Sequence, residues 1–465
     1  MLPDGAAVQR ADKGLDRRTF LRAGASVAGA AILTAACGGG SGASGPARKT
    51  IRIWDAYPKD YPSAKVMQGQ VWSAFLAKHP GFKLEYTAGL DPTQIASRFA
   101  NASLVNQEPD IFYNYASKGD LWLAGYLQPV ESILSDLGID DDFYPGALRI
   151  WSIEGHLYGI PTWYGTKCYA YRTDLLKKAG LNPDNLPAGW SDFAQMAGAC
   201  AIRKGNHFTQ DGYLYYATDD KAASSERLVT HIRQNGGTEF IGNQVTGKSG
   251  LREPAAIEAF TWFMDLIREH HCQSPDGPVA PNEPSELGKG LDAIEYMGPW
   301  TVPALGAAYP GCLDKITIGN NLTAQSLVSL GNAGAWSLNK KSDLLPEATD
   351  LMKILLKDKN YAAYNQDAKY PSARKSINAR PDFWMAQYPL VNKGPYAENL
   401  DSGSDVDNWH LGYSQIYSQA YATLIEKGVN RVGNDKDLMN QAADAIDAIT
   451  KQSLSALPGG AASGG

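Results

Sequence analysis

The chain contains little cysteine, no apolar run long enough to cross a bilayer and no excess of basic residues. Only five of its 465 residues are cysteine. Its uncharged N-terminal stretch, residues 23–36, is shorter than the roughly 20 apolar residues of a transmembrane helix, which excludes a polytopic membrane protein. The 43 Lys and Arg residues are outnumbered by 49 Asp and Glu, giving a formal net charge of −6. An acidic chain without a basic run is a poor candidate for nucleic-acid binding, which depends on neutralising phosphates.

What the sequence does contain favours a folded protein. Hydrophobic residues make up 44% of the chain and aromatic residues 10%. So high an aromatic content is incompatible with intrinsic disorder. The length of 465 residues indicates two or three domain-sized units with substantial cores.

The N-terminus has the pattern of an export signal. Arg17 and Arg18 precede the uncharged stretch of small residues at 23–36. A charged segment, a short apolar segment and small residues before a cleavage point form a signal peptide rather than a membrane span. The paired arginines resemble a twin-arginine export signal, although Asp16 stands where that pattern usually has Ser or Thr, so general secretion stays open as the route. We predict that residues 1–36 are an export signal peptide.

A candidate lipid anchor follows directly. Residues 34–37, Thr-Ala-Ala-Cys, resemble a lipobox, whose cysteine is acylated and becomes the new N-terminus. The Gly- and Ser-rich residues 37–48 have the composition of a flexible tether. We therefore predict an exported lipoprotein held through Cys37 on the outer face of the cytoplasmic membrane, at the cell surface or in the periplasm. An ordinary cysteine after a plain cleavage site is the alternative.

Four further cysteines, Cys168, Cys200, Cys272 and Cys312, lie in the body of the chain. An even number in an oxidising compartment permits two disulfides, and the sequence leaves all three pairings open. Their wide spacing excludes a zinc ribbon. The run His-His-Cys at 270–272 looks like a metal cluster, but adjacent residues on a helix point in different directions, so we interpret it as the surface of a helix end.

Strands alternate with helices along the chain. Residues 50–54 alternate with the period of two that a strand requires, whereas residues 62–79 place apolar residues at helical spacing. The opening order strand, helix, strand, helix, strand argues for a parallel or mixed sheet covered by helices, so the predicted fold class is α/β. Further strands are expected at 83–86, 109–113, 168–171, 213–217, 293–296, 315–318 and 335–338. Further helices are expected at 92–106, 191–204, 254–271, 345–356, 412–427 and 435–454.

One literal match to a nucleotide-binding motif is rejected. Residues 242–249 read Gly-Asn-Gln-Val-Thr-Gly-Lys-Ser, the pattern of a phosphate-binding loop. A working loop follows a buried strand and opens directly into a helix, whereas here the preceding strand is short and Pro254 delays the helix. We interpret the segment as a surface hairpin loop. The sequence also contains no nucleophile elbow and no zinc-protease motif.

Several short phrases, taken in order, carry a family resemblance. Each is weakly specific, but together they span residues 49–455. They are the segments 109–111, 124–129, 155–161, 169–181, 189–193, 293–300 and 369–374. The chain resembles the extracellular solute-binding proteins of ABC importers, in the sugar-binding class that is similar to maltose-binding protein.

The resemblance implies a two-lobed fold of the periplasmic-binding-protein type II, with mixed sheets flanked by helices and closure of the lobes about a hinge. The implied segments are 49–163 plus 333–368 for lobe 1, 167–330 plus 372–456 for lobe 2, and 457–465 for a flexible tail. The implied crossings between lobes lie at 162–167, near 331–333 and near 369–371.

A sugar has apolar C–H faces and a rim of hydroxyls, so its site needs flat aromatic side chains and polar groups that hydrogen-bond. Candidates are the residues at strand ends, crossovers and loops, where the cleft should open, several of which match family positions that reach the ligand. They are Asp55, Tyr57, Tyr115, Ser117, Trp163, Tyr164, Tyr216, Trp300, Asn332, Trp336 and Trp409. For each tryptophan, packing in the core is the alternative.

The predicted function is capture of a mono- or oligosaccharide between the lobes and its delivery to the permease subunits of an ABC importer. We expect a monomer with no catalytic residue, metal or cofactor. A secreted carbohydrate-active enzyme is one alternative, but it would need two carboxylates at a defined separation, which no motif marks. A binding protein for a polyamine or for Fe³⁺ is another; the iron alternative depends on the adjacent Tyr215 and Tyr216, without partner ligands that the sequence marks.

Overall fold

The computed structural model of the chain describes residues 48–205, 207–215, 221–279, 286–388, 394–400, 403 and 409–457. The export signal, Cys37 and Tyr216 lie outside the described residues. Within the described part of the chain, no helix is both long and apolar enough to span a bilayer.

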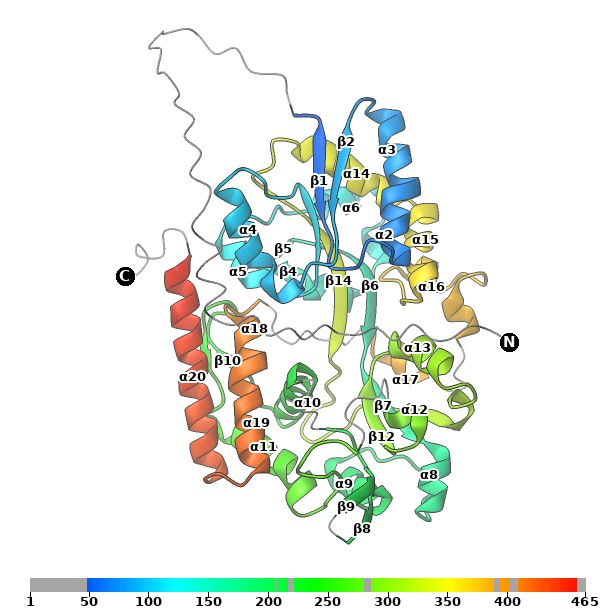
Figure 1. Cartoon of the computed structure of the whole chain (residues 1–465), viewed down its shortest axis with the longest axis vertical. Coiled ribbons are helices and arrows are strands. Elements are labelled where there is room, and N and C mark those ends of the chain that lie inside the picture. Colours follow the sequence, from blue (N-terminus) through cyan, green and yellow to red (C-terminus); the bar gives the residue numbers. More distant parts are fainter. Residues whose placement is uncertain are drawn as a thin grey trace, which may run out of the picture. The chain divides into compact units, whose positions relative to one another are not determined.

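A five-stranded sheet, the first sheet, organises the first half of the fold (Figure 1). Its strand order is β2-β1-β3-β14-β6, in which β1 runs parallel to β2 and β3, and β14 runs antiparallel to β3 and β6. The strands are β1 (Thr50–Trp54), β2 (Lys83–Thr87), β3 (Ile111–Asn114), β6 (Ile160–Thr166) and β14 (Gly331–Leu338). Every residue of β6 is buried, as expected for a strand covered on both faces.

Helices pack on the first sheet through their apolar faces. The helix predicted at 62–79 forms as two α-helices around a π-helical turn, with Pro62 in its first turn and Val66, Val71 and Phe75 buried. The helices of this half are α2 (Pro62–Val66), η1 (Met67–Val71), α3 (Trp72–Lys78), η2 (Pro92–Gln94), α4 (Ile95–Ser103), α5 (Lys118–Leu123), α6 (Glu131–Leu137), η3 (Asp140–Asp142), α7 (Pro145–Ile150), α14 (Leu345–Leu355) and α15 (Asp358–Ala368).

A three-stranded antiparallel sheet, the second sheet, organises the second half, with β7 in its centre. Its strands are β7 (Cys168–Arg172), β12 (Ile294–Met297) and β13 (Ile316–Gly319). Helices pack around this sheet, some in a second hydrophobic core and some in the core that also contains the first sheet. These helices are α8 (Thr173–Lys178), α9 (Trp190–Cys200), α10 (Lys221–Gln234), α11 (Pro254–Arg268), α12 (Glu286–Lys289), α13 (Thr301–Ala308), η4 (Leu313–Lys315), α17 (Gly394–Glu398), α18 (Tyr413–Gln415), η6 (Ile416–Tyr421), α19 (Ala422–Val429) and α20 (Asp435–Ala456).

Short elements complete the described fold. Three two-stranded hairpins are β4 (Ser152–Ile153) with β5 (His156–Leu157), β8 (Ile202–Lys204) with β9 (His207–Gln210), and β10 (Phe240–Ile241) with β11 (Lys248–Ser249). Two short helices, α16 (Lys375–Asn378) and η5 (Trp384–Gln387), follow α15. The chain passes from the first sheet to the second through Lys167, between β6 and β7, and returns through residues 320–330, between β13 and β14.

The structure corrects several sequence predictions. Of the strand expected at 213–217, residues 216 and 217 lie outside the described residues, and residues 213–215 form only an isolated bridge between Leu214 and Glu295. The helix expected at 191–204 ends at Cys200 because β8 begins two residues later. The four cysteines of the body of the chain are free and buried, so neither of the permitted disulfides forms. The hairpin expected at 242–249 is confirmed, since β10 and β11 pair there before α11 begins.

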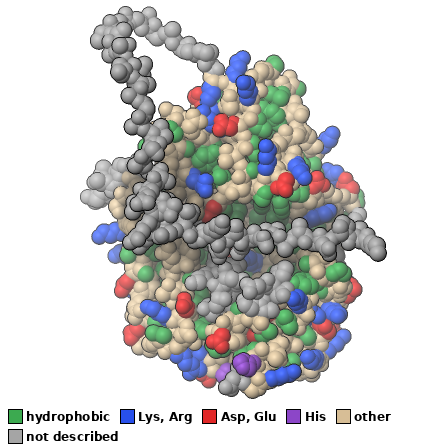
Figure 2. Space-filling model, viewed as in Figure 1, with side chains coloured by type: hydrophobic (Ala, Val, Ile, Leu, Met, Phe, Trp, Pro, Cys, Tyr) green, Lys and Arg blue, Asp and Glu red, His purple; other side chains and the backbone are tan. Residues whose placement is uncertain are grey.

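The surface bears charges of both signs. Figure 2 shows Lys and Arg side chains interspersed with Asp and Glu over the face it presents. The described side chains that this view shows therefore form no broad basic area of the kind that binds nucleic acid.

Candidate functional site

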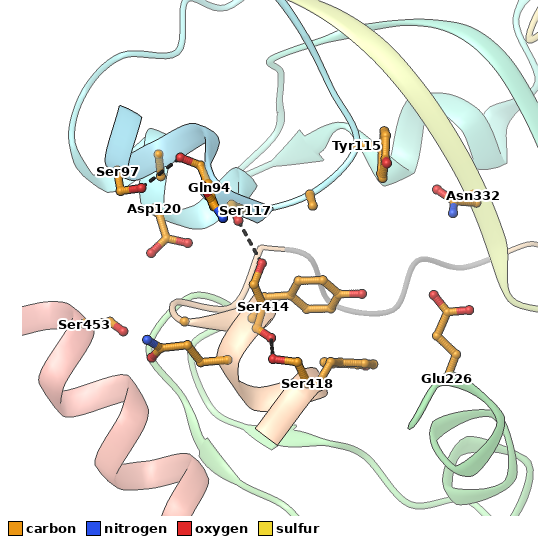
Figure 3. Close-up of a pocket in the computed structure, with 16 residues that line it drawn as sticks. Gln94, Ser97, Tyr115, Ser117, Asp120, Glu226, Asn332, Ser414, Ser418 and Ser453 are labelled. Carbon is orange, nitrogen blue, oxygen red and sulfur yellow. Dashed lines mark hydrogen bonds between the residues drawn. The ribbon is translucent and has the colours of Figure 1, made fainter. Parts of the chain in front are cut away.

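A cavity of about 590 Å³ lies between the two halves (Figure 3). This volume is in the range of small-molecule binding pockets. The first half contributes Gln94, Ala96, Ser97, Tyr115, Ala116, Ser117, Asp120 and Asn332. The second half contributes Glu226, Gly412, Tyr413, Ser414, Gln415, Tyr417, Ser418 and Ser453.

The turn after β3 places Tyr115 and Ser117 at the cavity. Buried Asn114 holds this turn, because its side-chain oxygen accepts the backbone N–H of Tyr115 (2.8 Å) and of Ala116 (3.1 Å), and its amide nitrogen donates to the Ala116 carbonyl. Ser117 then adopts a left-handed backbone (φ 54°) immediately before α5. The strand end thus presents a half-exposed ring and a hydroxyl to the cavity.

Two hydrogen bonds, one from this turn and one from α5, cross the cavity to the segment that begins α18. Ser117 Oγ lies 3.2 Å from Ser414 Oγ (Figure 3). The carboxylate of Asp120, in the first turn of α5, accepts the backbone N–H of Gly412. Burial raises the pKa of Asp120 to about 6, an effect that these backbone hydrogen bonds partly oppose.

On the opposite side of the cavity, Glu226 of α10 and Asn332 of β14 point inward (Figure 3). Glu226 forms a largely buried ion pair with Lys167, the residue that links the two sheets. Lys167, in the connection between the halves, therefore holds the Glu226 side chain in place at one wall of the cavity.

An aromatic cluster lies at the same crossover. Trp163 stacks on Tyr370 (ring centroids 5.0 Å apart) and contacts Trp300 of the second half (5.3 Å). Its indole N–H donates to the Tyr113 hydroxyl at 2.6 Å. Tyr57, three residues beyond the end of β1, packs on Tyr113 and Tyr370. Rings from both halves thus converge here, with Trp163 and Tyr113 buried and Tyr57, Trp300 and Tyr370 partly exposed, and none of them lines the cavity described above.

Asp55 holds the loop that carries Tyr57 of this cluster. It is fully buried, and its carboxylate accepts the Tyr57 backbone N–H (2.9 Å) and the Tyr86 hydroxyl. Burial raises the pKa of Asp55 to about 6. These hydrogen bonds mean that the Asp55 carboxylate orders the loop 55–57.

Three predicted ligand residues lie in packed interiors instead. Tyr164 is fully buried next to Gly146 and Gly331, on the opposite face of β6 from Trp163. Trp336 is fully buried in the core of the first half. Trp409 is 1% exposed, and its indole N–H donates to the Ile150 carbonyl at 3.0 Å.

The structure therefore brings Tyr115, Ser117 and Asn332 together at the cavity, and Tyr57, Trp163 and Trp300 together in the aromatic cluster. Sequence reasoning missed the cavity residues on helices and on the α18 segment. They include Asp120, Glu226, Tyr413, Ser414 and Tyr417. Asp120 is only three residues beyond the predicted Ser117, so the sequence did contain a signal that it lies near the site.

The chemistry available in the cavity is that of recognition. Hydroxyl, amide and carboxylate groups supply donors and acceptors, and tyrosine rings supply flat apolar faces. No group of three or more His, Cys, Asp or Glu side chains is arranged to hold a metal ion in the described part of the chain.

Residues 70–391 match the family of bacterial extracellular solute-binding proteins, and the chain belongs to this family. A lactose-binding protein of Rhizobium radiobacter is 24% identical over 410 residues, which cover 80% of this chain and 90% of that protein. An arabinooligosaccharide-binding protein of Bacillus subtilis (strain 168) is 29% identical over 219 residues, 47% of this chain and 43% of that protein. The chain thus aligns with less than half of the second relative.

The fold also matches a solved binding protein. The sugar-binding protein MalE of Xanthomonas citri superposes with a TM-score of 0.70 at 17% identity, covering 87% of this chain and 98% of that chain. The fold is therefore the mixed α/β periplasmic-binding-protein fold, with mixed sheets flanked by helices. The family resemblance seen in the sequence is confirmed, and the class is one of binding proteins rather than enzymes.

Proposed function

We propose that this protein captures a mono- or oligosaccharide in the cavity between its halves and delivers it to the permease subunits of an ABC importer. The observation that carries the proposal is the lining of the cavity. It combines five serine hydroxyls, three side-chain amides and two carboxylates with three tyrosines, a set that matches the hydroxyl rim and apolar faces of a sugar. The lactose- and arabinooligosaccharide-binding relatives favour the same class of ligand.

The proposal includes hinge closure between two lobes with the bounds implied by the sequence, 49–163 plus 333–368 and 167–330 plus 372–456. The cavity is lined from both sides, so a ligand would contact both halves only when they are together. Such a ligand stabilises the closed state by the contacts that the open state lacks. The Ser117–Ser414 and Asp120–Gly412 contacts favour the same state.

Titration calorimetry tests the ligand class. We expect at least one of lactose, arabinotriose and maltotriose to bind saturably with one site per chain, and Tyr115→Ala to weaken that binding about tenfold because a stacking ring is lost. Tyr309→Ala, at a half-buried tyrosine that does not line the cavity, should leave the affinity unchanged. Saturable binding of spermidine or Fe³⁺, with none of any sugar, would contradict the proposal.

Membrane attachment through Cys37, after export by a twin-arginine or general signal, is part of the same proposal. An importer subunit works at the membrane, and a tether at 37–48 would let the binding domain reach the permease. The rest of the chain offers no spanning helix among its described residues, so attachment would depend on the acylated cysteine.

Cys37→Ala is therefore expected to move the protein from the membrane fraction to the soluble fraction of cells. Cys312→Ala is the matched control, because that cysteine is buried in the folded body and should not affect fractionation. Membrane association that persists in Cys37→Ala would show that the lipobox interpretation is wrong.

A further inference from the structure

The charged side chains that line the cavity are all acidic. Two carboxylates, Asp120 and Glu226, line it, and none of its described lining residues is Lys or Arg. Glu226 is neutralised by its ion pair with Lys167. Asp120 has a different environment, since the contacts described for it are backbone N–H groups, those of Gly412 and of Asp120 itself.

The cationic side chains near Asp120 are directed elsewhere. Lys118, on the same helix, is buried with its ammonium donating to the Ile150 carbonyl (2.6 Å) and lying over the rings of Trp151 and Trp409. Arg98 on α4 and Lys451 on α20 are exposed and do not line the cavity.

Among the described residues, the other titratable groups near Asp120 are one histidine, which does not line the cavity, three tyrosines and one acidic residue. His410, two residues before Gly412, is buried, and its ring nitrogens contact the carbonyls of Leu411 (3.1 Å) and Gly247 (3.0 Å). Tyr115, Tyr413 and Tyr417 line the cavity as neutral phenols, and Asp91, on the segment before α4, is acidic and exposed.

We propose that Asp120 makes this cavity select solutes that present hydroxyl or ammonium hydrogens to its carboxylate, and reject anionic solutes such as uronic acids and sugar phosphates. The inference rests on the proposed function, because it takes the cavity as the ligand site. Figure 3 shows the carboxylate of Asp120 directed from α5 toward the gap beside Ser453 and the α18 segment.

The physical reason is the acceptor capacity of a carboxylate. An ionised carboxylate accepts about four hydrogen bonds, and backbone donors occupy only part of that capacity here. A vicinal diol or an ammonium group can donate to the rest, whereas the carboxylate or phosphate group of an anionic solute has no hydrogen to donate and repels the Asp120 carboxylate in a partly desolvated site. A neutral oligosaccharide satisfies this requirement as well as an amino sugar does.

Asp120→Asn separates charge from shape. An asparagine amide oxygen can still accept the Gly412 N–H, so the contact between the halves is kept while the negative charge is removed. Asp184→Asn, at an exposed carboxylate outside the cavity, is the matched control. Thermal melting of both variants checks that each is folded.

The probes are the tightest neutral sugar of the calorimetric panel, trigalacturonate as the anion and a glucosamine trimer as the cation. For the wild type at pH 7.5 we expect trigalacturonate to bind at least about a hundredfold more weakly than the neutral sugar. In Asp120→Asn the affinity for the neutral sugar should fall about ten- to a hundredfold, and the discrimination against the anion should shrink. Asp184→Asn should match the wild type.

The pH profile of binding, recorded for the wild type and for Asp120→Asn, gives a second measurement. A carboxylate with a raised pKa loses its charge as the pH falls, so the wild-type affinity for the neutral sugar should drop roughly tenfold between pH 7.5 and pH 5. Asp120→Asn should show a flat profile. Tight binding of trigalacturonate by the wild type, or an Asp120→Asn variant with unchanged selectivity and pH profile, would overturn this inference alone, whereas failure of every sugar to bind would contradict the proposed function.

Discussion

Replacement of Trp409 by alanine is expected to lower the free energy of unfolding by about 3–5 kcal/mol, the cost of truncating a fully buried tryptophan. Its ring packs against the ammonium of Lys118 (5.2 Å) and edge-on to Tyr158 (6.2 Å), in a cluster shared by both halves. The Ile150 carbonyl keeps its hydrogen bond from Lys118 in the variant, so the loss is mainly one of packing. Urea unfolding of wild type and variant measures the difference.

Trp409→Phe separates the ring from the indole N–H. It keeps most of the apolar volume and loses the 3.0 Å hydrogen bond to Ile150, so the expected cost is only about 1–2 kcal/mol. The same site can be disturbed from the other side, because a Cβ on Gly119 would come within 1.8 Å of the Trp409 carbonyl oxygen. If Trp409→Ala instead left the unfolding curve unchanged and weakened sugar binding, Trp409 would be a ligand residue after all.

The contrast between Trp409 and the cavity residues shows which part of the site the sequence could predict. Tyr115 and Ser117 follow a strand that periodicity identifies, and strand ends open into the cleft of this fold, so their place was predictable. No strand pattern directly precedes Trp409 in the sequence. Its burial depends on Lys118 and on Ile150, partners some 260 to 290 residues earlier in the chain, and local pattern does not reveal them.

Strands buried on both faces limit prediction in another way. In β6, Trp163 turns to the aromatic cluster while its neighbour Tyr164 turns to the interior, because successive side chains alternate. The sequence shows two adjacent aromatic residues at a crossover and does not tell which of them faces the cleft. Trp336 in β14 presents the same difficulty: both sides of that strand are covered, so the sequence does not tell whether its ring faces the cleft or the core.

The helix that carries Glu226 was missed for a related reason. The sequence of α10 is rich in polar residues, yet Ser225, Thr230, His231 and Gln234 are fully buried in the second half. Burial of polar side chains in a helix follows from hydrogen bonds and packing with distant elements, such as the bond from Ser225 Oγ to the Tyr417 carbonyl (2.9 Å). The amphipathic periodicity of α10 is therefore weak, and the wall of the cavity that α10 forms was not predicted.

Trp300 is expected to behave in the opposite way to Trp409. It is half-buried, belongs to the second half and contacts Trp163 of the first half, so its ring lies where the two halves meet. Gly165 makes this approach possible, because a Cβ there would lie 3.0 Å from the Trp300 ring. Gly165 pairs in the sheet with the cavity residue Asn332, so we expect a sugar bound in the cavity to extend onto the Trp300 ring. Loss of that stacking contact costs about 1.5–3 kcal/mol, so Trp300→Ala should weaken sugar binding about tenfold to a hundredfold.

Stability should change little in Trp300→Ala, because a half-exposed ring leaves no closed cavity when it is removed. Trp336→Ala is the matched control: that ring is fully buried, so the variant should lose several kcal/mol of stability, about 3–5, while any folded fraction binds normally. Calorimetric titration and thermal melting of both variants resolve the two patterns. A large fall in the melting temperature of Trp300→Ala with an unchanged dissociation constant would assign Trp300 to packing between the halves, and the stacking surface for a sugar would then have to come from the tyrosines of the cavity alone.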